Sequence, residues 1–260
     1  MPKLRQGALR RISLGSAEAD AALGGGLPAR GLTEIHLDEA RDGGTLAGFA
    51  LGLAIRLGAA RARPLLWIAD GAAFAEAGLP YGPGLAGFGL DPAALVLVRA
   101  RRLADAAWAA EEAAACAALA AAILEVRGNP ARLELEGTRR LHLRAREAGV
   151  PLLLLRQSAR PQATAAPMRL RIRPGPAAPV EDLPGAARLI GRPVFDVAVE
   201  KSRDGRPQNC RLEWNSDERR FGLVRPARAE PLSRRPPAAS VDGPDPARDA
   251  GPVLALRRAS

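Results

Sequence analysis

The segment from Leu37 to Thr45, LDEARDGGT, lies where a phosphate-binding loop would connect a strand to a helix. It follows the apolar run Leu32 to Leu37 and precedes apolar residues spaced for a mostly buried helix, Leu46 to Leu57. A working loop has the pattern G-x-x-x-x-G-K-[ST], in which backbone N–H groups surround the phosphates, the lysine contacts the β- and γ-phosphates and the hydroxyl contacts magnesium. The chemistry that this position would offer is therefore nucleotide binding.

The glycine and lysine positions of that pattern are not kept. A one-residue shift leaves two alignments, and in each of them a glycine, Gly43 or Gly44, stands where the lysine should be. The first glycine position falls on Leu37 or Asp38, and the second falls on Asp42 or Gly43. Neither alignment restores the cation that a triphosphate needs.

The charges of the loop also oppose a nucleotide. Asp38, Glu39 and Asp42 are opposed only by Arg41, and like charges would disfavour a triphosphate here. Thr45 keeps its role in one of the two alignments. We therefore expect no bound cofactor and no ATPase activity, and we interpret the segment as a capped helix after a strand.

Further apolar runs indicate that strands and helices alternate along the chain. Strands are predicted at 65–70, 95–98, 121–126 and 150–155, and helices at about 103–119 and 132–148. This order is typical of an α/β fold with a largely parallel sheet covered by helices on both faces. Alternating residues at 194–201 and 210–214 around the turn Asp204-Gly205 predict a hairpin, with a further short strand at 221–224.

The composition changes after Arg225. Residues 226–260 are rich in Pro, Ala, Arg and Asp and show no apolar period, so we expect one folded core, 1–225, and a disordered tail. The Pro/Gly/Ala-rich segment 174–193 is predicted to be a linker or a meandering connection. Within the tail, Val253, Leu254 and Leu256 form a short apolar cluster, which is either a partner-docking motif or an unselected end.

Charge and cysteine content limit the function further. The chain has 260 residues and a net charge of +10 carried almost wholly by arginine, which permits contact with nucleic acid or with an acidic protein. Cys116 and Cys210 have no paired spacing, so we expect no disulfide and no metal site, and both are interpreted as packed in the fold. His36 and His142 are interpreted as ordinary fold residues. No membrane span or export signal is recognised, and we expect a cytoplasmic, nucleoid-associated protein.

Two resemblances follow from these pieces. In the order and spacing of GSAEADAALGGGLP and GLTEIHL, the segment from Leu14 to Leu57 resembles the opening of RecA-type ATPases. From about Leu9 to Val224 the chain is similar to the ImuA family, bacterial proteins once grouped with the SulA cell-division inhibitors. The further pieces that carry this similarity are PLLWIAD, FGLDPAALVLVRARRLADAAWAAEEA, VPLLLLR and RPVFDVAVEKSRDGRPQNCRLEWNSDERRFGLV. The resemblance implies a RecA-like core in which the C-terminal hairpin finishes the sheet edge.

The RecA resemblance also assigns positions to three residues. Ala72 stands where the family has an acidic residue that activates water. Glu125 falls at the position of a magnesium-associated carboxylate, and Gln157 falls in a phosphate-sensing polar pair. Without the lysine a carboxylate has little nucleotide to serve, so we interpret Glu125 as a surface acid at a strand end and Gln157 as a relic. No catalytic residue is predicted.

Residues 156–173 contain five arginines and no acid: Arg156, Arg160, Arg169, Arg171 and Arg173. In RecA-type proteins the loop at this position faces the central DNA axis, so these side chains could pair with phosphates. No aromatic residue lies among them to stack on bases. The last three arginines alternate with apolar residues, which is typical of a strand with a solvated basic face, and both interpretations stay open.

The ImuA resemblance implies an accessory protein of SOS-induced, error-prone translesion DNA synthesis. It implies two partners, the inactive Y-family polymerase homologue ImuB and an error-prone replicative-type polymerase, with RecA as a further candidate. We expect a protein-binding adaptor, and we expect no long self-filaments because the N-terminal segment 1–11 is short. The alternatives are a divergent RecA-type ATPase that binds DNA and uses Arg41 in place of the lysine, and a SulA-like cell-division inhibitor.

Overall fold

The computed structural model describes residues 10–58, 63–177, 191–203 and 208–224. Within these ranges the chain forms one nine-stranded sheet and one separate strand pair. The strands are β1 (Arg11–Ile12), β2 (Leu27–Pro28), β3 (Gly31–His36), β4 (Leu65–Asp70), β5 (Leu95–Ala100), β6 (Ala121–Arg127), β7 (Pro151–Gln157), β8 (Met168–Pro174), β9 (Val194–Ser202), β10 (Gln208–Asn215) and β11 (Arg220–Leu223).

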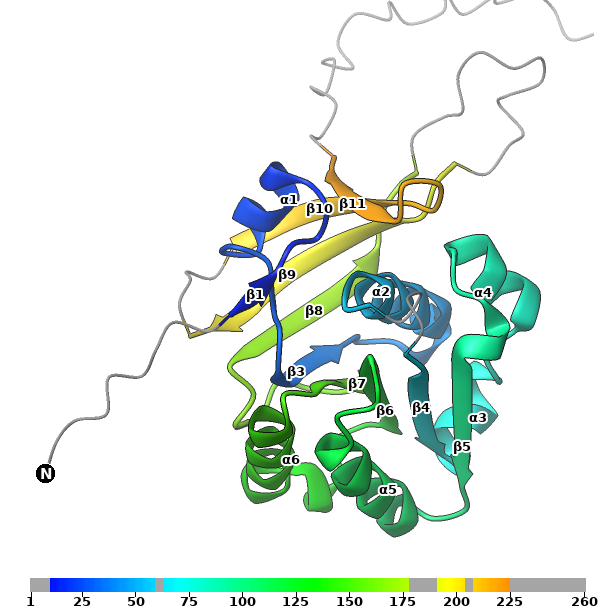
Figure 1. The fold of residues 1–260 in the computed structure, drawn as a ribbon, viewed down its shortest axis with the longest axis vertical. Helices are drawn as coiled ribbons and strands as arrows, with labels where there is room; N and C mark the ends of the chain where they lie inside the picture. The colour runs from blue at the N-terminus through cyan, green and yellow to red at the C-terminus, as the bar shows by residue number, and fades with distance from the viewer. Residues whose placement is uncertain (1–9, 59–62, 178–190, 204–207, 225–260) are drawn as a thin grey trace, which may run out of the picture. The chain divides into compact units, whose positions relative to one another are not determined.

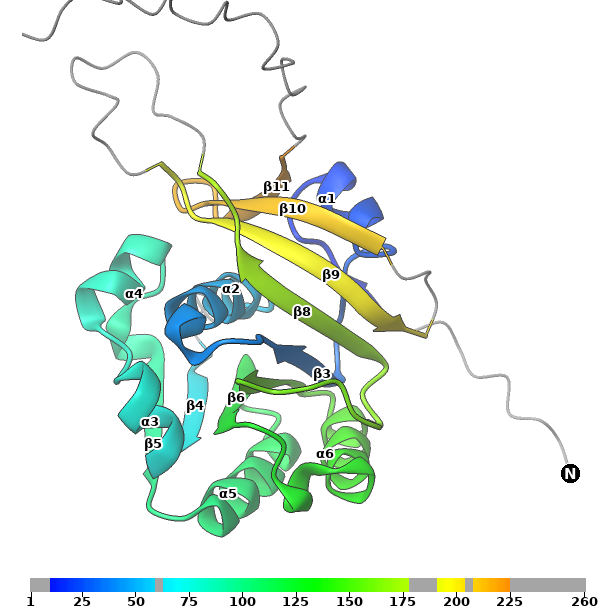
Figure 2. The ribbon, with the colours of Figure 1, turned by 180° about the vertical axis from the view of Figure 1, so that it is seen from behind.

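Helices connect the strands from β3 to β7 in chain order, and α1 lies between β1 and β2. The α-helices are α1 (Ala17–Ala22), α2 (Gly43–Arg56), α3 (Gly71–Ala77), α4 (Gly82–Phe88), α5 (Leu103–Ala115) and α6 (Leu135–Ala148). Three short 3-10 turns accompany them: η1 (Ala40–Asp42), η2 (Pro92–Ala94) and η3 (Ala131–Leu133). Figures 1 and 2 show α5 and α6 together below the sheet, with α2 on the other face.

The large sheet has the strand order β11-β10-β9-β8-β3-β7-β6-β4-β5. From β8 to β5 neighbouring strands run parallel, whereas β9, β10 and β11 run antiparallel to their neighbours. Because the parallel strands all end at the same edge, the loop after β3 lies beside the ends of β6 and β7. This edge holds the loop together with Glu125 and Gln157, the two polar residues that the RecA resemblance singles out.

Two apolar layers hold the helices against the sheet. On one face, α2 packs Leu46, Phe49 and Leu53 into a cluster that includes Trp67 and Phe221. On the other face, the alanines of α5 and the buried side of α6 pack against apolar residues of β4, β6 and β7. Alternate residues of each inner strand enter opposite layers, which explains why these strands read as continuous apolar runs.

The structure confirms the predicted fold class. The core is α/β with a mostly parallel sheet, and the C-terminal strands β9 to β11 finish one edge of it. The basic alternation before Pro174 forms β8, as the strand interpretation predicts. The helix predicted at 103–119 is shorter, because α5 ends at Ala115 and Leu119 donates its N–H to the carbonyl of Cys116 in a turn.

Cysteine and histidine placement corrects one expectation. Cys116 is exposed, so the interpretation of both cysteines as packed is wrong for this residue, whereas Cys210 is half-buried. Burial raises the pKa of the Cys210 thiol to about 11. Both histidines lie within the fold: His36 Nε2 is 2.9 Å from Glu200 Oε2, and His142 Nδ1 accepts the N–H of Leu32 at 3.2 Å. The predicted tail, 226–260, and most of the linker lie outside the described residues.

Candidate functional site

The predicted phosphate-loop position is a tight turn between β3 and α2. The strand ends at His36, the turn η1 occupies 40–42, and α2 begins at Gly43. Asp42 is the N-cap residue of α2, but its side chain makes no capping hydrogen bond. The strand, loop and helix are therefore present as predicted, and the first backbone N–H of α2, that of Gly43, already donates to the carbonyl of Ala40.

Arginines from β8 offset the acidity of the loop. Arg173 Nη2 donates to Asp38 Oδ2 at 2.6 Å, and Arg171 Nη1 lies 3.8 Å from the same oxygen. The hydrogen bond from Arg173 lowers the pKa of Asp38 below its ordinary value. Sequence separation hides this pairing, because β8 follows the loop by more than a hundred residues and reaches it only through the β3–β8 pairing.

The one cation of the loop itself, Arg41, forms an ion pair with an acid of the same loop. Arg41 Nη2 lies 2.7 Å from Glu39 Oε2, and its side chain is 78% exposed. This is the residue that a nucleotide-binding interpretation needs in place of the lysine. In the structure its guanidinium group is paired with Glu39, and its side chain extends into solvent.

Glu125 is buried, which corrects its interpretation as a surface acid. The residue is 3% exposed, and both of its carboxylate oxygens are occupied: Oε2 accepts the indole N–H of Trp67 at 2.9 Å, and Oε1 accepts an amide N–H of Gln157 at 2.6 Å. Burial raises the pKa of Glu125 above its ordinary value of 4.5, while the two hydrogen bonds oppose that rise. Gln157 is therefore a structural partner of this carboxylate.

A pocket of about 290 Å³ opens beside this carboxylate. Glycines at the start of α2, the α3–α4 connection with Tyr81, and Trp67 line it together with Glu125. Its volume lies at the lower limit of the roughly 300–1,000 Å³ that small-molecule sites occupy. Its walls are mostly apolar, and the pairing of Glu125 leaves its carboxylate oxygens already engaged.

Arg156 is fully buried, so the expectation that it contacts DNA is wrong. Its Nε lies 3.2 Å from Glu34 Oε1, and that glutamate is also buried on the neighbouring strand β3. A second nitrogen, Nη2, donates to the carbonyl of Leu133 at 2.5 Å. Burial lowers the pKa of Arg156, and the nearby Glu34 opposes that shift. The residue thus joins β7, β3 and η3 inside the protein.

The three arginines of β8 share two acids, Glu200 and Asp38, along one strand face. Arg169 Nε donates to Glu200 Oε2 at 3.1 Å, and Arg171 Nε lies 3.4 Å from the other oxygen of Glu200. With Arg173 on Asp38, all three are paired with acids, although Arg173 remains 59% exposed. Arg160 lies in the β7–β8 connection and is exposed; its backbone N–H donates to Asn129.

Three residues of these networks were missed by reasoning from the sequence: Trp67, Glu34 and Glu200. Each is defined by a partner on another strand, so no local pattern marks it. The described part of the chain contains no group of three or more His, Cys, Asp or Glu residues that could hold a metal ion. In the same residues, no helix has both the length and the apolar character needed to cross a membrane.

Comparison with known proteins identifies relatives that match most of the chain. The chain is 30% identical over 209 residues to the protein named ImuA in each of two strains of Caulobacter vibrioides. The match covers 75% of this chain and 80% of the relative. No family model matches the chain.

Proposed function

This chain belongs to the ImuA family, and we propose that it is a non-catalytic accessory protein of error-prone translesion DNA synthesis that acts by binding other proteins. Its proposed partners are an ImuB-like inactive Y-family homologue and an error-prone replicative-type polymerase, with RecA as a further candidate. The family resemblance supports these partners. The adaptor role is inferred from the site and from the surface.

The observation that carries the non-catalytic role is the state of the loop before α2. No lysine is present between 37 and 45, and the loop's one cation, Arg41, is paired with Glu39 in solvent. The carboxylate that would serve a magnesium ion, Glu125, is instead buried under Trp67 and Gln157. A triphosphate placed here would lack the cation that the pattern normally supplies.

The exposed edge of the sheet supports a protein-binding role. Among the described residues β5 pairs only with β4, so its other side carries unpaired backbone groups. Val96 and Leu97 on this strand are 47% and 38% exposed, and adjacent strand residues face opposite sides of a sheet. Natural edges are usually protected by charge, proline or a bulge. β5 carries one exposed charge, Arg99, near its end, and its apolar first part suits the addition of a partner's strand.

Nucleotide binding tests the non-catalytic part. We expect a fluorescent ATP analogue with magnesium to show no saturable binding at millimolar concentration, with or without single-stranded DNA. Saturable micromolar binding that Glu125→Ala abolishes would overturn the proposal. The second candidate function is a divergent ATPase. One observation favours it: Arg171 and Arg173 bring cations to the loop through Asp38. Replacing both arginines would then also abolish nucleotide binding.

Copurification tests the adaptor part. We expect the full chain to copurify with the ImuB-like partner, and we expect Val96→Lys to weaken that complex because it places a charge on the apolar edge. Leu143→Lys is the matched control, since Leu143 on α6 is also 47% exposed and lies away from β5. Equal retention of the partner by both variants would exclude the β5 edge as its binding surface.

Direct DNA contact is a separate part of the proposal. Arg160 and Arg173 are the more exposed of the predicted contacts, although Arg173 is bound to Asp38, whereas Arg169 and Arg171 are less exposed and are held by Glu200. Replacing Arg160 and Arg173 with alanine should weaken DNA binding and flatten its dependence on salt, because each phosphate contact releases counterions. Unchanged binding and salt dependence would remove DNA from the list of partners.

A further inference from the structure

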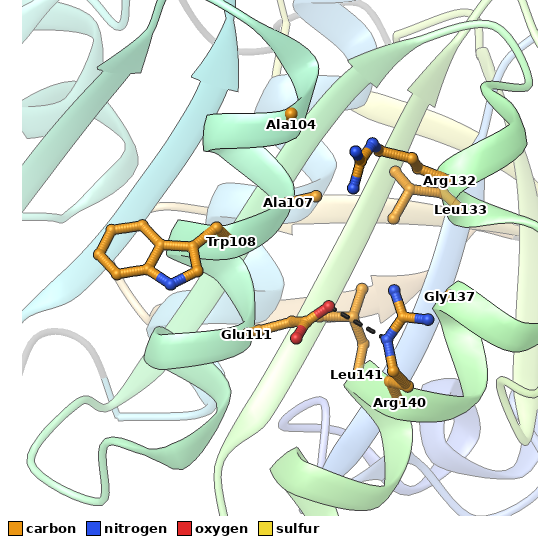
Figure 3. Close-up of a pocket in the computed structure, with 9 residues that line it drawn as sticks. All are labelled: Ala104, Ala107, Trp108, Glu111, Arg132, Leu133, Gly137, Arg140 and Leu141. Atoms are coloured by element: carbon orange, nitrogen blue, oxygen red, sulfur yellow. Dashed lines mark hydrogen bonds and ion pairs between the residues drawn. The ribbon is translucent and has the colours of Figure 1, made fainter.

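A second pocket lies between α5 and α6, on the face of the sheet opposite α2. Its α5 wall consists of Ala104, Ala107, Trp108 and Glu111, and its other wall consists of Arg132, Leu133, Gly137, Arg140 and Leu141 (Figure 3). We propose that this pocket docks an acidic segment of a partner protein, which inserts one apolar side chain between the helices and places a carboxylate on Arg132. This surface goes beyond the proposed β5 edge and does not depend on it.

The size of the pocket selects the kind of occupant. Its volume is about 180 Å³. Sites for small molecules and cofactors usually measure roughly 300–1,000 Å³, so this pocket is too small for a nucleotide or a comparable cofactor. The lining is mixed: Leu133, Leu141 and the alanines of α5 supply its apolar part, and Glu111, Arg132 and Arg140 supply its polar part. This combination suits one inserted aliphatic side chain with a carboxylate beside it.

Trp108 supplies an exposed apolar surface at the rim. The side chain is 67% exposed, whereas Trp67 and Trp214 are buried. Figure 3 shows its indole directed outward from α5, away from Arg132, so it extends the apolar surface beyond the pocket itself. Tryptophan is among the residues that most often dominate protein interfaces, because a large rigid side chain is desolvated at low entropic cost.

The charges of the pocket favour an acidic partner. Glu111 and Arg140 face each other across it and form an ion pair at 3.2 Å, which leaves little net charge on that pair. Arg132 is exposed and has no acidic partner within the described residues. The lining therefore carries one unpaired positive charge, and a carboxylate beside the inserted side chain would complement it.

The pocket is preformed by the backbone beneath it. A Cβ atom at Gly137 would lie 1.8 Å from the carbonyl oxygen of Arg132, so η3 sits directly against the start of α6. The buried Arg156 holds the same turn through the carbonyl of Leu133. Arg132 and Leu133 are thus fixed relative to α6 before any partner arrives, which lowers the entropic cost of docking.

Peptide-display selection on the immobilised full chain tests the proposal without a known partner. With a library of random peptides, we expect enrichment of sequences that combine an aliphatic or aromatic residue with a neighbouring aspartate or glutamate. A synthetic peptide of an enriched sequence should reduce the quenching of tryptophan fluorescence by acrylamide, because Trp108 is the exposed tryptophan of the three. The selection uses neither nucleotide nor the ImuB-like partner, so its outcome is independent of the proposed function.

Exposed-site variants localise the binding. Calorimetry should show a loss of about 30-fold in affinity for Trp108→Ala and about tenfold for Arg132→Glu. A peptide whose acids are replaced by lysine should bind Arg132→Glu better than it binds the wild type. Arg30→Glu, at an exposed arginine outside the pocket lining, is the control for overall charge and should leave affinity within about twofold.

Several outcomes would overturn the proposal. The selection could enrich no peptide, or it could enrich peptides without acidic residues. The peptide could also bind the wild type and both pocket variants with equal affinity. Self-association of the full chain that Trp108→Ala abolishes would identify a second copy as the occupant. Protection of Trp108 by single-stranded DNA, lost in Arg132→Glu, would identify nucleic acid instead.

Discussion

The buried ion pair between Glu34 and Arg156 gives the sharpest prediction about stability. Both side chains are at most 1% exposed, and the pair joins two neighbouring strands of the sheet. Removing one member leaves the other as an uncompensated charge in the interior, which costs about 3–5 kcal/mol. We therefore expect Glu34→Met and Arg156→Met each to lower the free energy of unfolding by about that amount.

Removing both charges should cost much less than the sum of the single changes. Replacing a whole buried pair with apolar residues of similar size is often neutral or stabilising. Here the double variant also loses the hydrogen bond from Arg156 to the carbonyl of Leu133, which costs about 1–3 kcal/mol. The double variant should therefore be destabilised by about 1–3 kcal/mol, well below the summed single effects.

Urea unfolding at neutral pH, followed by circular dichroism, measures these differences in a double-mutant cycle. Arg160→Met is the control, because that arginine is exposed and its change should alter stability by less than about 0.5 kcal/mol. Additive costs in the double variant, or single costs below about 1 kcal/mol, would refute the description of Glu34 and Arg156 as a buried pair. Weakened DNA binding by a fully folded Arg156→Met variant would restore the DNA-contact interpretation.

Three further predictions concern single sites. Because burial raises the pKa of Glu125, the wild type should lose stability relative to Glu125→Gln as pH rises above 4.5, and urea midpoints across that range should show the change; parallel pH profiles would contradict it. Gly137→Ala drives a Cβ into the η3 carbonyl and should cost about 3 kcal/mol, whereas Gly44→Ala, with nothing within 4 Å, should not destabilise; equal urea midpoints would contradict this. Iodoacetamide at about pH 8 should label Cys116 and spare Cys210 in the native protein, and labelling of both at equal rates would contradict the assigned burial.

Much of the fold could be predicted because apolar runs report burial directly. Runs such as 65–70 and 150–155 are buried on both faces, so they read as strands without any partner being known. The end of α5 was misplaced because the alanine-rich stretch around Cys116 carries neither a glycine nor a proline to mark it. The chain leaves the helix there and returns to the sheet through the bond from Ala120 N–H to Pro64 O.

The polar networks could not be predicted because their members come from different strands. A carboxylate at a strand end is usually solvated, so the sequence predicts a surface acid at Glu125. Its burial depends on Trp67 and Gln157, which reach it only through the pairing of β4, β6 and β7. The sequence likewise groups Arg156 with the other arginines, because its partner Glu34 precedes it by more than a hundred residues.

The same networks bear on where the protein meets other molecules. At the carboxyl edge of the sheet, Glu125 has both oxygens occupied and Asp38 is bound to Arg173, so the groups that could contact a ligand already contact the protein. Breaking the contacts of Glu125 would leave buried polar groups unpaired, which costs about 1–3 kcal/mol for each group. By contrast, Val96, Leu97 and Trp108 leave apolar surface in solvent, and covering it releases free energy without breaking any bond. The binding proposed at the β5 edge and at the α5–α6 pocket therefore has a thermodynamic advantage over binding at the loop, which is the physical reason for proposing a protein that works through its partners.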